Sequence, residues 1–287
     1  MSYRSQSIIR GALFIIAAEL SFAISAAAIK LLSINLPNES IVFFRNFFGL
    51  LALIPLLIRA DLNILQTSQL HLHLLRSLSG VAAMYCFFYA IAHISLGNLM
   101  LIKSTIPIII PIVAFAWLGE QILNLTRLAI AIGFIGVFLI LKPDADIDWA
   151  ILVAIASSIM AAIAFVTVRK LSATEPTLRI VLYFASIGLC VSAIPLIWTW
   201  QTPSLFQWLM LIVVGIATTL GQLLLTRGYA SAPASNVGIF TYTSVPFGAL
   251  LGWFFWNELW DETSLIGAAL IVLAGSISLR TKKSASN

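Results

Sequence analysis

The chain has 287 residues, of which 61% are hydrophobic and only 9% are charged, and its formal net charge is +5. Soluble domains carry about 25% charged residues, so this composition excludes a protein that covers itself with a polar surface. In lipid, the backbone must satisfy its own hydrogen bonds, which a helix does. The sequence therefore predicts an all-helical integral membrane protein.

Apolar stretches long enough to cross a bilayer follow one another along the whole chain. A spanning helix needs about 20 residues. We predict ten transmembrane helices, at residues 11–32, 40–58, 74–93, 96–118, 124–141, 149–168, 178–200, 206–228, 234–256 and 263–280. The first of them is similar to a signal peptide, but Glu19 interrupts it and the apolar run continues to Leu32, so we expect it to remain uncleaved.

The basic residues indicate how the chain crosses the membrane. If the N-terminus is inside, most Lys and Arg residues fall on inner loops and tails, whereas Lys30 and Lys142 lie outside. The positive-inside rule then places both termini in the cytoplasm, and we expect the protein to lie in the inner membrane. The positive net charge is explained by topology, so we expect no nucleic-acid partner.

The second half of the chain repeats the first. Lys30 and Pro55 are matched, at the same spacing, by Lys170 and Pro195. Further matches are Ile41-Val42 with Ile180-Val181, Tyr89 with Tyr229, Asn98 with Asn236, Pro107 with Pro246, and Glu120 with Glu258. Because each half has an odd number of helices, the second half enters from the opposite side, which predicts an inverted 5+5 repeat. Its units are residues 1–142 and 149–287, joined by an outer linker at 143–148.

Three ionisable side chains lie well inside the predicted helices. At 1.5 Å of rise per residue, Arg45 and Lys103 lie about 8 and 10 Å below the outer face, and Glu19 lies about 12 Å above the inner face. Charges in hydrocarbon are costly and tend to face a cavity or a partner. Two cations above a carboxylate suit an acid or a zwitterion, and Glu19 is also the candidate for proton coupling. The alternatives are structural: Arg45 can snorkel to the interface, and Glu19 can pair with a polar neighbour.

A polar turn precedes a proline at the matched position of each half. Residues 103–107 correspond to residues 242–246, and a proline inside a helix removes a hydrogen bond. We predict helix breaks at Pro107 and Pro246. The functional interpretation places Lys103 opposite Tyr242 in one asymmetric site. The alternative is that the hydroxyl groups beside the prolines only satisfy freed carbonyls.

Further residues are candidates for the site or for its gates. Tyr85 and Tyr89 share one helix face with Phe88 and form either an aromatic wall of the site or a packing stripe. Gln222 is a lone amide in an apolar run and is a candidate cavity residue. Glu120 and Glu258 end their helices and are interpreted as gate or loop-ordering residues. Neither a metal-ligand spacing nor a nucleotide-binding loop occurs in the sequence, so we expect no metal, no cofactor and no direct use of ATP.

Three sequence motifs resemble a known superfamily. Leu118-Gly119-Glu120 after Pro107, and Asn257-Glu258 after Pro246, resemble the signature that closes the fourth helix of each half in the drug/metabolite transporter superfamily. The run from Gly267 to Gly275 resembles the last helix of its EamA-type branch. The resemblance implies ten helices, a central cavity lined by helices 1–4 and 6–9, and peripheral helices 5 and 10. Residues 43–48 and 73–76 resemble the corresponding region of S-adenosylmethionine carriers.

The sequence thus predicts a secondary transporter of the inner membrane that works by alternating access. Its substrate is expected to be a small polar metabolite with an acidic end, either amino-acid-like or a nucleoside-linked zwitterion such as S-adenosylmethionine. The alternative is efflux of organic cations, amines or drugs, anchored by Glu19. An integral-membrane enzyme is disfavoured because no catalytic cluster occurs in the sequence. The expected partners are the substrate and the bilayer, and a homodimer is not required.

Overall fold

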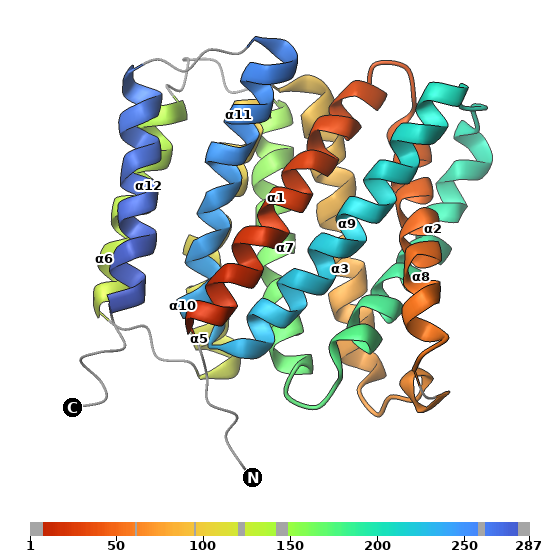
Figure 1. Ribbon diagram of the computed structural model, residues 1–287, viewed down its shortest axis with the longest axis horizontal. Helices are drawn as coiled ribbons and strands as arrows, with labels where there is room; N and C mark the ends of the chain where they lie inside the picture. Colours follow the sequence, from red (N-terminus) through yellow and green to blue (C-terminus); the bar gives the residue numbers. More distant parts are fainter. Residues whose placement is uncertain are drawn as a thin grey trace.

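The computed structural model describes residues 8–60, 62–94, 96–119, 124–141, 149–257 and 262–280. These residues form helices joined by turns, and none of them belongs to a strand. The long helices run roughly along one direction and form a single bundle (Figure 1). The predicted all-helical membrane fold is confirmed.

The helices coincide with all ten predicted segments. The first half contains α1 (Ile8–Leu32), α2 (Asn38–Leu57), the 3-10 helix η1 (Leu62–Leu65), α3 (Leu70–His93), α4 (Leu96–Lys103), α5 (Ile106–Leu118) and α6 (Asn124–Leu141). The second half contains α7 (Trp149–Leu171), α8 (Thr177–Thr199), α9 (Leu205–Ser231), α10 (Ala234–Val237), the 3-10 helix η2 (Gly238–Thr243), α11 (Ser244–Trp256) and α12 (Glu262–Arg280). Within the described ranges, seven helical segments are long and apolar enough to cross a membrane, with η2 and α11 counted together.

One predicted segment in each half is divided into shorter helices. In the first half, α4 ends at Lys103, a two-residue turn follows at 104–105, and α5 begins at Ile106 with Pro107 in its first turn. The hydroxyl groups of Ser104 and Thr105 donate hydrogen bonds to carbonyls of the preceding turn, both at 2.8 Å. In the second half, η2 separates α10 from α11, and Pro246 lies in the first turn of α11. The hydroxyl groups therefore satisfy carbonyls near the break, as they do in other broken membrane helices.

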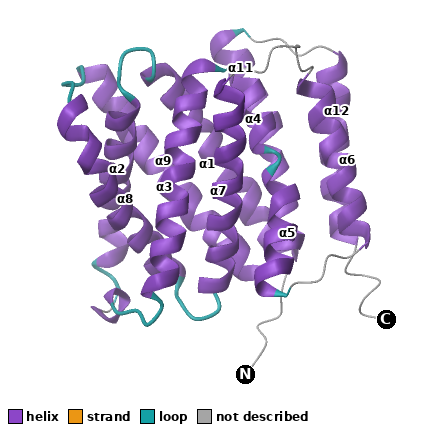
Figure 2. Cartoon of the chain, turned by 180° about the vertical axis from the view of Figure 1, so that it is seen from behind, coloured by secondary structure: helices purple, strands orange, loops and turns teal. Residues whose placement is uncertain are grey.

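The main packing contacts join the two halves. Helix α1 packs on α9, α3 packs on α7, and α2 packs on both α8 and α9. Helices α6 and α12 pack on each other and form one edge of the bundle, on the left of Figure 1 and on the right of Figure 2. The buried core of the bundle therefore lies between the two halves.

Two matched contacts show the internal symmetry directly. The ammonium of Lys30, in the last turn of α1, lies 4.9 Å from the ring centroid of Trp256. The ammonium of Lys170, in the last turn of α7, lies 4.7 Å from the ring centroid of Trp117. In both contacts, a lysine that ends the first helix of one half covers the tryptophan near the end of the fourth segment of the other half. Equivalent contacts between halves are expected of an inverted repeat.

Candidate functional site

A cavity lies between the halves of the bundle. Its volume is about 140 Å³. Its walls come from α1 to α5 and from α7 to α9, and most of its lining is apolar or aromatic. Neither the described residues of α6 and α12 nor those of the α10–α11 segment line it. Its few polar side chains are therefore the groups that can orient a ligand.

An ion pair occupies one side of this cavity. The Lys103 ammonium, in the last turn of α4, donates to the Glu19 carboxylate of α1 at 2.5 Å. Glu19 is fully buried, whereas Lys103 lines the cavity and lies 5.4 Å from the ring of Phe22. The second carboxylate oxygen of Glu19 has no hydrogen-bond partner among the described residues. The two opposite charges compensate each other, so this pair adds no net charge to the wall.

Two arginines lie against one aromatic ring on another side of the cavity. The guanidinium carbon of Arg76, from α3, lies 3.6 Å from the ring centroid of Phe184 in α8. That of Arg45, from α2, lies 5.0 Å from the same centroid. Both arginines are buried and both line the cavity. The aromatic face attracts both cations and holds them on one wall; we call Arg45, Arg76 and Phe184 the arginine pair and its ring.

Amide side chains hold the two guanidinium groups in place. Arg45 donates to the Oδ1 atom of Asn46 and Arg76 donates to the Oε1 atom of Gln222, each at 2.5 Å. The Nε atom of Arg76 is buried without an acceptor in the described structure. Neither arginine takes part in a salt bridge within the described ranges. Because an amide oxygen brings no negative charge, these contacts leave the charge of both guanidinium groups uncompensated at the cavity.

A glycine provides the space for the Arg76 guanidinium. A Cβ atom on Gly80, one turn after Arg76 on α3, would lie 2.5 Å from a terminal nitrogen of Arg76 and 2.8 Å from the Phe184 ring. A real Cβ is essentially never so close to its neighbours, so any other residue at this position would displace the guanidinium. The arrangement of Arg76 on Phe184 thus depends on the missing side chain.

The cavity wall has an excess of positive charge. Of the described residues, Arg45, Arg76 and Lys103 line it, and Glu19, behind Lys103, supplies the compensating carboxylate. A buried cation without a counter-charge is costly. Such a site favours a ligand that brings negative charge, and carboxylate and phosphate groups match the fork of a guanidinium.

The other predicted residues are distributed around the bundle. Gln222 lines the cavity, as does Phe88. Tyr242, in η2, is buried with its ring against Gly133 of α6 and does not line the cavity. Tyr85 does not line it either, and Tyr89 is 37% exposed and stacks on His93 at 4.3 Å between ring centroids. Glu120, Glu258 and the linker at 143–148 lie outside the described residues.

Sequence reasoning did not place Arg76 and Phe184 at the cavity, which both of them line. The predicted third helix begins at residue 74, which assigned Arg76 to the inner interface, but α3 begins at Leu70 and buries Arg76 in its second turn. A signal was present, because residues 73–76 belong to the stretch that resembles S-adenosylmethionine carriers. Phe184 gave no signal, since one phenylalanine in an apolar helix is not distinctive.

Comparison with known proteins identifies the family. Residues 9–142 and 148–280 each match the EamA-like transporter family. The chain belongs to this family. It is 34% identical to the pseudopaline exporter CntI of Pseudomonas aeruginosa over 277 residues, which cover 95% of this chain and 97% of that protein.

Two further relatives of this EamA-like protein are also named as transporters. The riboflavin transporter of Vibrio cholerae is 29% identical over 96% of this chain and 95% of its own length. The S-adenosylmethionine uptake transporter of Rickettsia bellii is 27% identical over 89% of this chain and 88% of its own length. A solved crystal structure has the same fold, with a TM-score of 0.79 and 17% identity over 99% of this chain and 100% of the other. The protein is thus a multi-pass membrane transporter of metabolites, and the prediction of a transporter rather than an enzyme is confirmed.

Proposed function

We propose that this EamA-like protein is a secondary transporter of small metabolites that carry a carboxylate or phosphate group. The single observation that supports this substrate class is the arginine pair, which lines the cavity and has no salt bridge within the described residues. A ligand that supplies the missing negative charge gains two charge-assisted hydrogen-bonding partners. An amino-acid-like compound or a nucleoside-linked zwitterion such as S-adenosylmethionine meets this requirement.

Each polar residue then has a distinct role. Arg45 and Arg76 hold the acidic group, and Asn46 and Gln222 keep the guanidinium groups oriented. Glu19 is the candidate for proton coupling, because a proton on its carboxylate removes the charge that holds Lys103 and frees that ammonium for the ligand. Transport follows when the two halves, residues 1–142 and 149–287, move relative to each other and expose the cavity to each side in turn.

The orientation is inferred from the distribution of basic residues. With both termini in the cytoplasm and the protein in the inner membrane, the turn between α7 and α8 lies on the cytoplasmic side. The competing function, efflux of organic cations anchored by Glu19, fits this geometry less well. The Glu19 carboxylate is already paired with Lys103, and a cationic substrate would meet two further positive groups at the cavity.

Thermal-shift measurements on the purified protein test the substrate class. The probes are matched pairs that differ in the acidic group alone: an amino acid with its amide, and a nucleoside monophosphate with its nucleoside. A ligand at about a hundred times its Kd adds about 2.7 kcal/mol to the folded state, which raises Tm by roughly 5–10 °C. We expect such a rise from an acidic member of at least one pair and none from its uncharged counterpart.

Two variants make this test specific. Arg76→Gln should abolish the rise in Tm, whereas Arg59→Gln, at an exposed position after α2, should leave it unchanged. If amines alone raise Tm and Arg76→Gln has no effect on that rise, the acid-binding site is wrong and cation efflux takes its place.

A further inference from the structure

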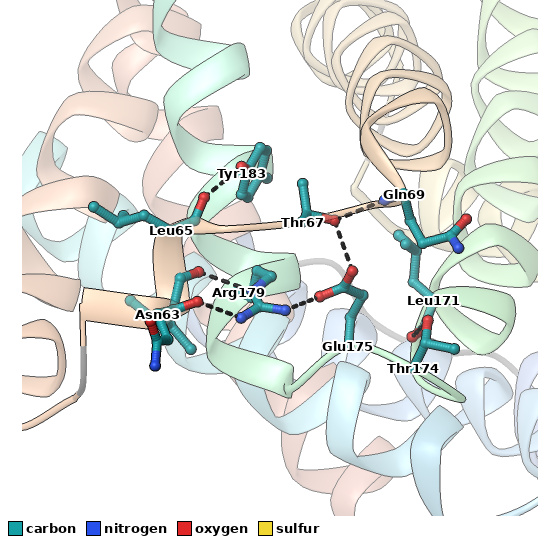
Figure 3. Close-up of polar contacts among 10 residues, drawn as sticks. Asn63, Leu65, Thr67, Gln69, Leu171, Thr174, Glu175, Arg179 and Tyr183 are labelled. Atoms are coloured by element: carbon teal, nitrogen blue, oxygen red, sulfur yellow. Dashed lines mark hydrogen bonds and ion pairs between the residues drawn. The ribbon is translucent and has the colours of Figure 1, made fainter.

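A second polar cluster, whose residues do not line the cavity, joins the two halves at one end of the bundle (Figure 3). Arg179, in the first turn of α8, donates from Nε to the carbonyl of Ile64 at 2.9 Å and from a terminal nitrogen to the carbonyl of Asn63 at 2.5 Å. Its other terminal nitrogen forms an ion pair with Glu175 in the α7–α8 turn. Glu175 also accepts a hydrogen bond from the Thr67 hydroxyl at 2.6 Å.

Helix α8 contributes one more contact to this cluster. The Tyr183 hydroxyl donates to the carbonyl of Leu65 at 2.8 Å, and the Tyr183 ring stacks on His73 of α3 with 4.3 Å between ring centroids. The α2–α3 connection of the first half is therefore tied to the α7–α8 region of the second half by side chains that satisfy three successive carbonyls. We call Thr67, Glu175, Arg179 and Tyr183 the latch.

The charge state of the latch carboxylate suits a stable closed contact. Burial on its own raises the pKa of Glu175, but the hydrogen bonds from Thr67 and Arg179 hold the pKa below its usual range. The carboxylate is then ionised at neutral pH, so the ion pair with Arg179 is present under ordinary conditions. Hydrogen bonds with an ionised partner are about twice as strong as neutral ones.

The position of the latch relates it to the cavity. The α2–α3 connection and the α7–α8 turn lie at the end of the bundle where α1 begins and α12 ends, the lower end of Figure 1. On α8, Tyr183 of the latch directly precedes Phe184 of the arginine pair and its ring. On α3, His73 lies one turn before Arg76. The latch therefore contacts α3 and α8, the helices that carry Arg76 and the Phe184 ring.

The opposite end of the bundle is built differently, although the repeat relates the two ends. In the register that matches Ile41 with Ile180, Arg179 corresponds to Ser40 and Tyr183 corresponds to Phe44. Phe44 packs on aromatic rings, with 4.7 Å to the ring centroid of Trp208. The polar contacts of the latch are thus specific to one end, so they are not a requirement of the repeat itself.

We infer that the latch is the gate that closes one end of the transport pathway and must separate before the cavity opens toward that end. This inference rests on the proposed alternating access, since a gate has a role only if the halves move. To that mechanism the inference adds the residues that hold one end of the pathway closed. The loop carbonyls of residues 63–65 are the surface on which the gate closes.

Cysteine accessibility tests the gate without any substrate. In a background with Cys86→Ser and Cys190→Ser, Ala161→Cys places a thiol at the cavity. A membrane-impermeant maleimide is applied to right-side-out and inverted vesicles. Ala173→Cys, at an exposed position in the α7–α8 turn, identifies the vesicles that present the latch end to the reagent. When the latch residues are unchanged, maleimide applied from the latch end should not react with the Ala161→Cys thiol.

Opening the latch should change this result. Glu175→Gln with Arg179→Gln removes both charges together, so no buried charge is left unpaired. We expect labelling of Ala161→Cys from the latch end to become about tenfold faster, which corresponds to about 1.4 kcal/mol on the equilibrium between closed and open ends. Tyr183→Phe, which copies the residue of the opposite end, should accelerate labelling less but in the same direction. This variant keeps the test valid if the double variant does not fold.

A variant of another arginine at the same end of the bundle is the control. Arg227→Gln removes the same charge near the same end, at an exposed position on α9 in the second half. It should leave the labelling rate unchanged. If the latch variants label at the parent rate, or if Arg227→Gln accelerates labelling equally, the latch is not the gate. Either result leaves the ligand-binding measurements with Arg76→Gln unaffected.

Discussion

The charged residues of this protein differ in how their charge is compensated. The cavity lysine, Lys103, is neutralised by a buried carboxylate, Glu19. The cavity arginines contact amide oxygens of Asn46 and Gln222, which orient a guanidinium but leave its charge uncompensated. A wall built this way combines one internally balanced pair with two cations available to a ligand. The difference predicts distinct consequences of mutation at the two places.

Breaking the Glu19–Lys103 pair should destabilise the fold, whereas removing both charges should not. Loss of one member of a buried ion pair costs about 3–5 kcal/mol, because the remaining charge is left without a partner. We expect Glu19→Gln and Lys103→Met each to lower Tm in detergent, and the double variant to recover most of the loss. Glu262→Gln, at an exposed carboxylate in the first turn of α12, is the control and should leave Tm unchanged. A double variant whose loss equals the sum of the two single losses would contradict the pairing.

At the scale of the helices, apolar length made the fold predictable from the sequence. Each predicted segment coincides with one helix or with one divided helix, because the thickness of the bilayer sets the length independently of tertiary packing. The exception is the start of α3. Because His71 and His73 are polar, the sequence predicts a loop at this position. In the structure His73 is in α3 and is buried, with its ring stacked on Tyr183. Tertiary contacts that extend a helix are not visible in its own composition.

The contact between α2 and α9 depends on close approach of their backbones. A Cβ atom on Gly215 of α9 would lie 3.0 Å from the backbone nitrogen of Gly49 on α2, and one on Gly49 would lie 2.7 Å from the hydroxyl of Thr219. Small residues permit such an approach in membranes, where packing rather than water drives helix association.

Gly215→Ala should therefore destabilise the fold by about 1–3 kcal/mol, the usual cost of forcing an extra group into a packed interface. Backbone atoms oppose the added methyl group, so the helices have to separate. Gly238→Ala is the matched control, because its nearest neighbour is the flexible end of Ile110 at 3.2 Å. Thermal unfolding in detergent compares the two. An equal fall in Tm for both variants would show that close backbone approach is not what distinguishes Gly215.

At the scale of the whole molecule, the site was only partly predictable. Charges and a lone amide in apolar helices are rare, and this rarity led to Arg45, Lys103 and Gln222, which the structure brings to one cavity. Aromatic residues are common in membrane helices, so Tyr85 and Tyr242 could not be distinguished from packing residues in the sequence. The side chains that meet between the halves, such as Arg76 and Gln222, are more than a hundred positions apart in the chain. A single sequence contains no direct information about such contacts.

The halves contact each other at both ends, and alternating access requires each end to separate in turn. This requirement leads to a direct prediction about a tether across the latch. Thr67→Cys and Glu175→Cys, in the background with Cys86→Ser and Cys190→Ser, place two thiols where a hydrogen bond of 2.6 Å joins the halves. A short bifunctional methanethiosulfonate should bridge them. Transport in proteoliposomes should stop when the bridge forms and return when dithiothreitol removes it.

The matched control is Glu175→Cys with Arg179→Cys, which breaks the same latch but places both thiols in the second half, one helical turn apart. The same reagent bridges this pair without joining the halves, so transport should continue at the rate of the untreated variant. Ligand binding, measured by thermal shift, should survive in both, because neither bridge touches the cavity. If transport persists through a complete bridge between residues 67 and 175, this end does not need to open. The two halves would then have to carry the substrate by a movement that leaves the α7–α8 turn in place.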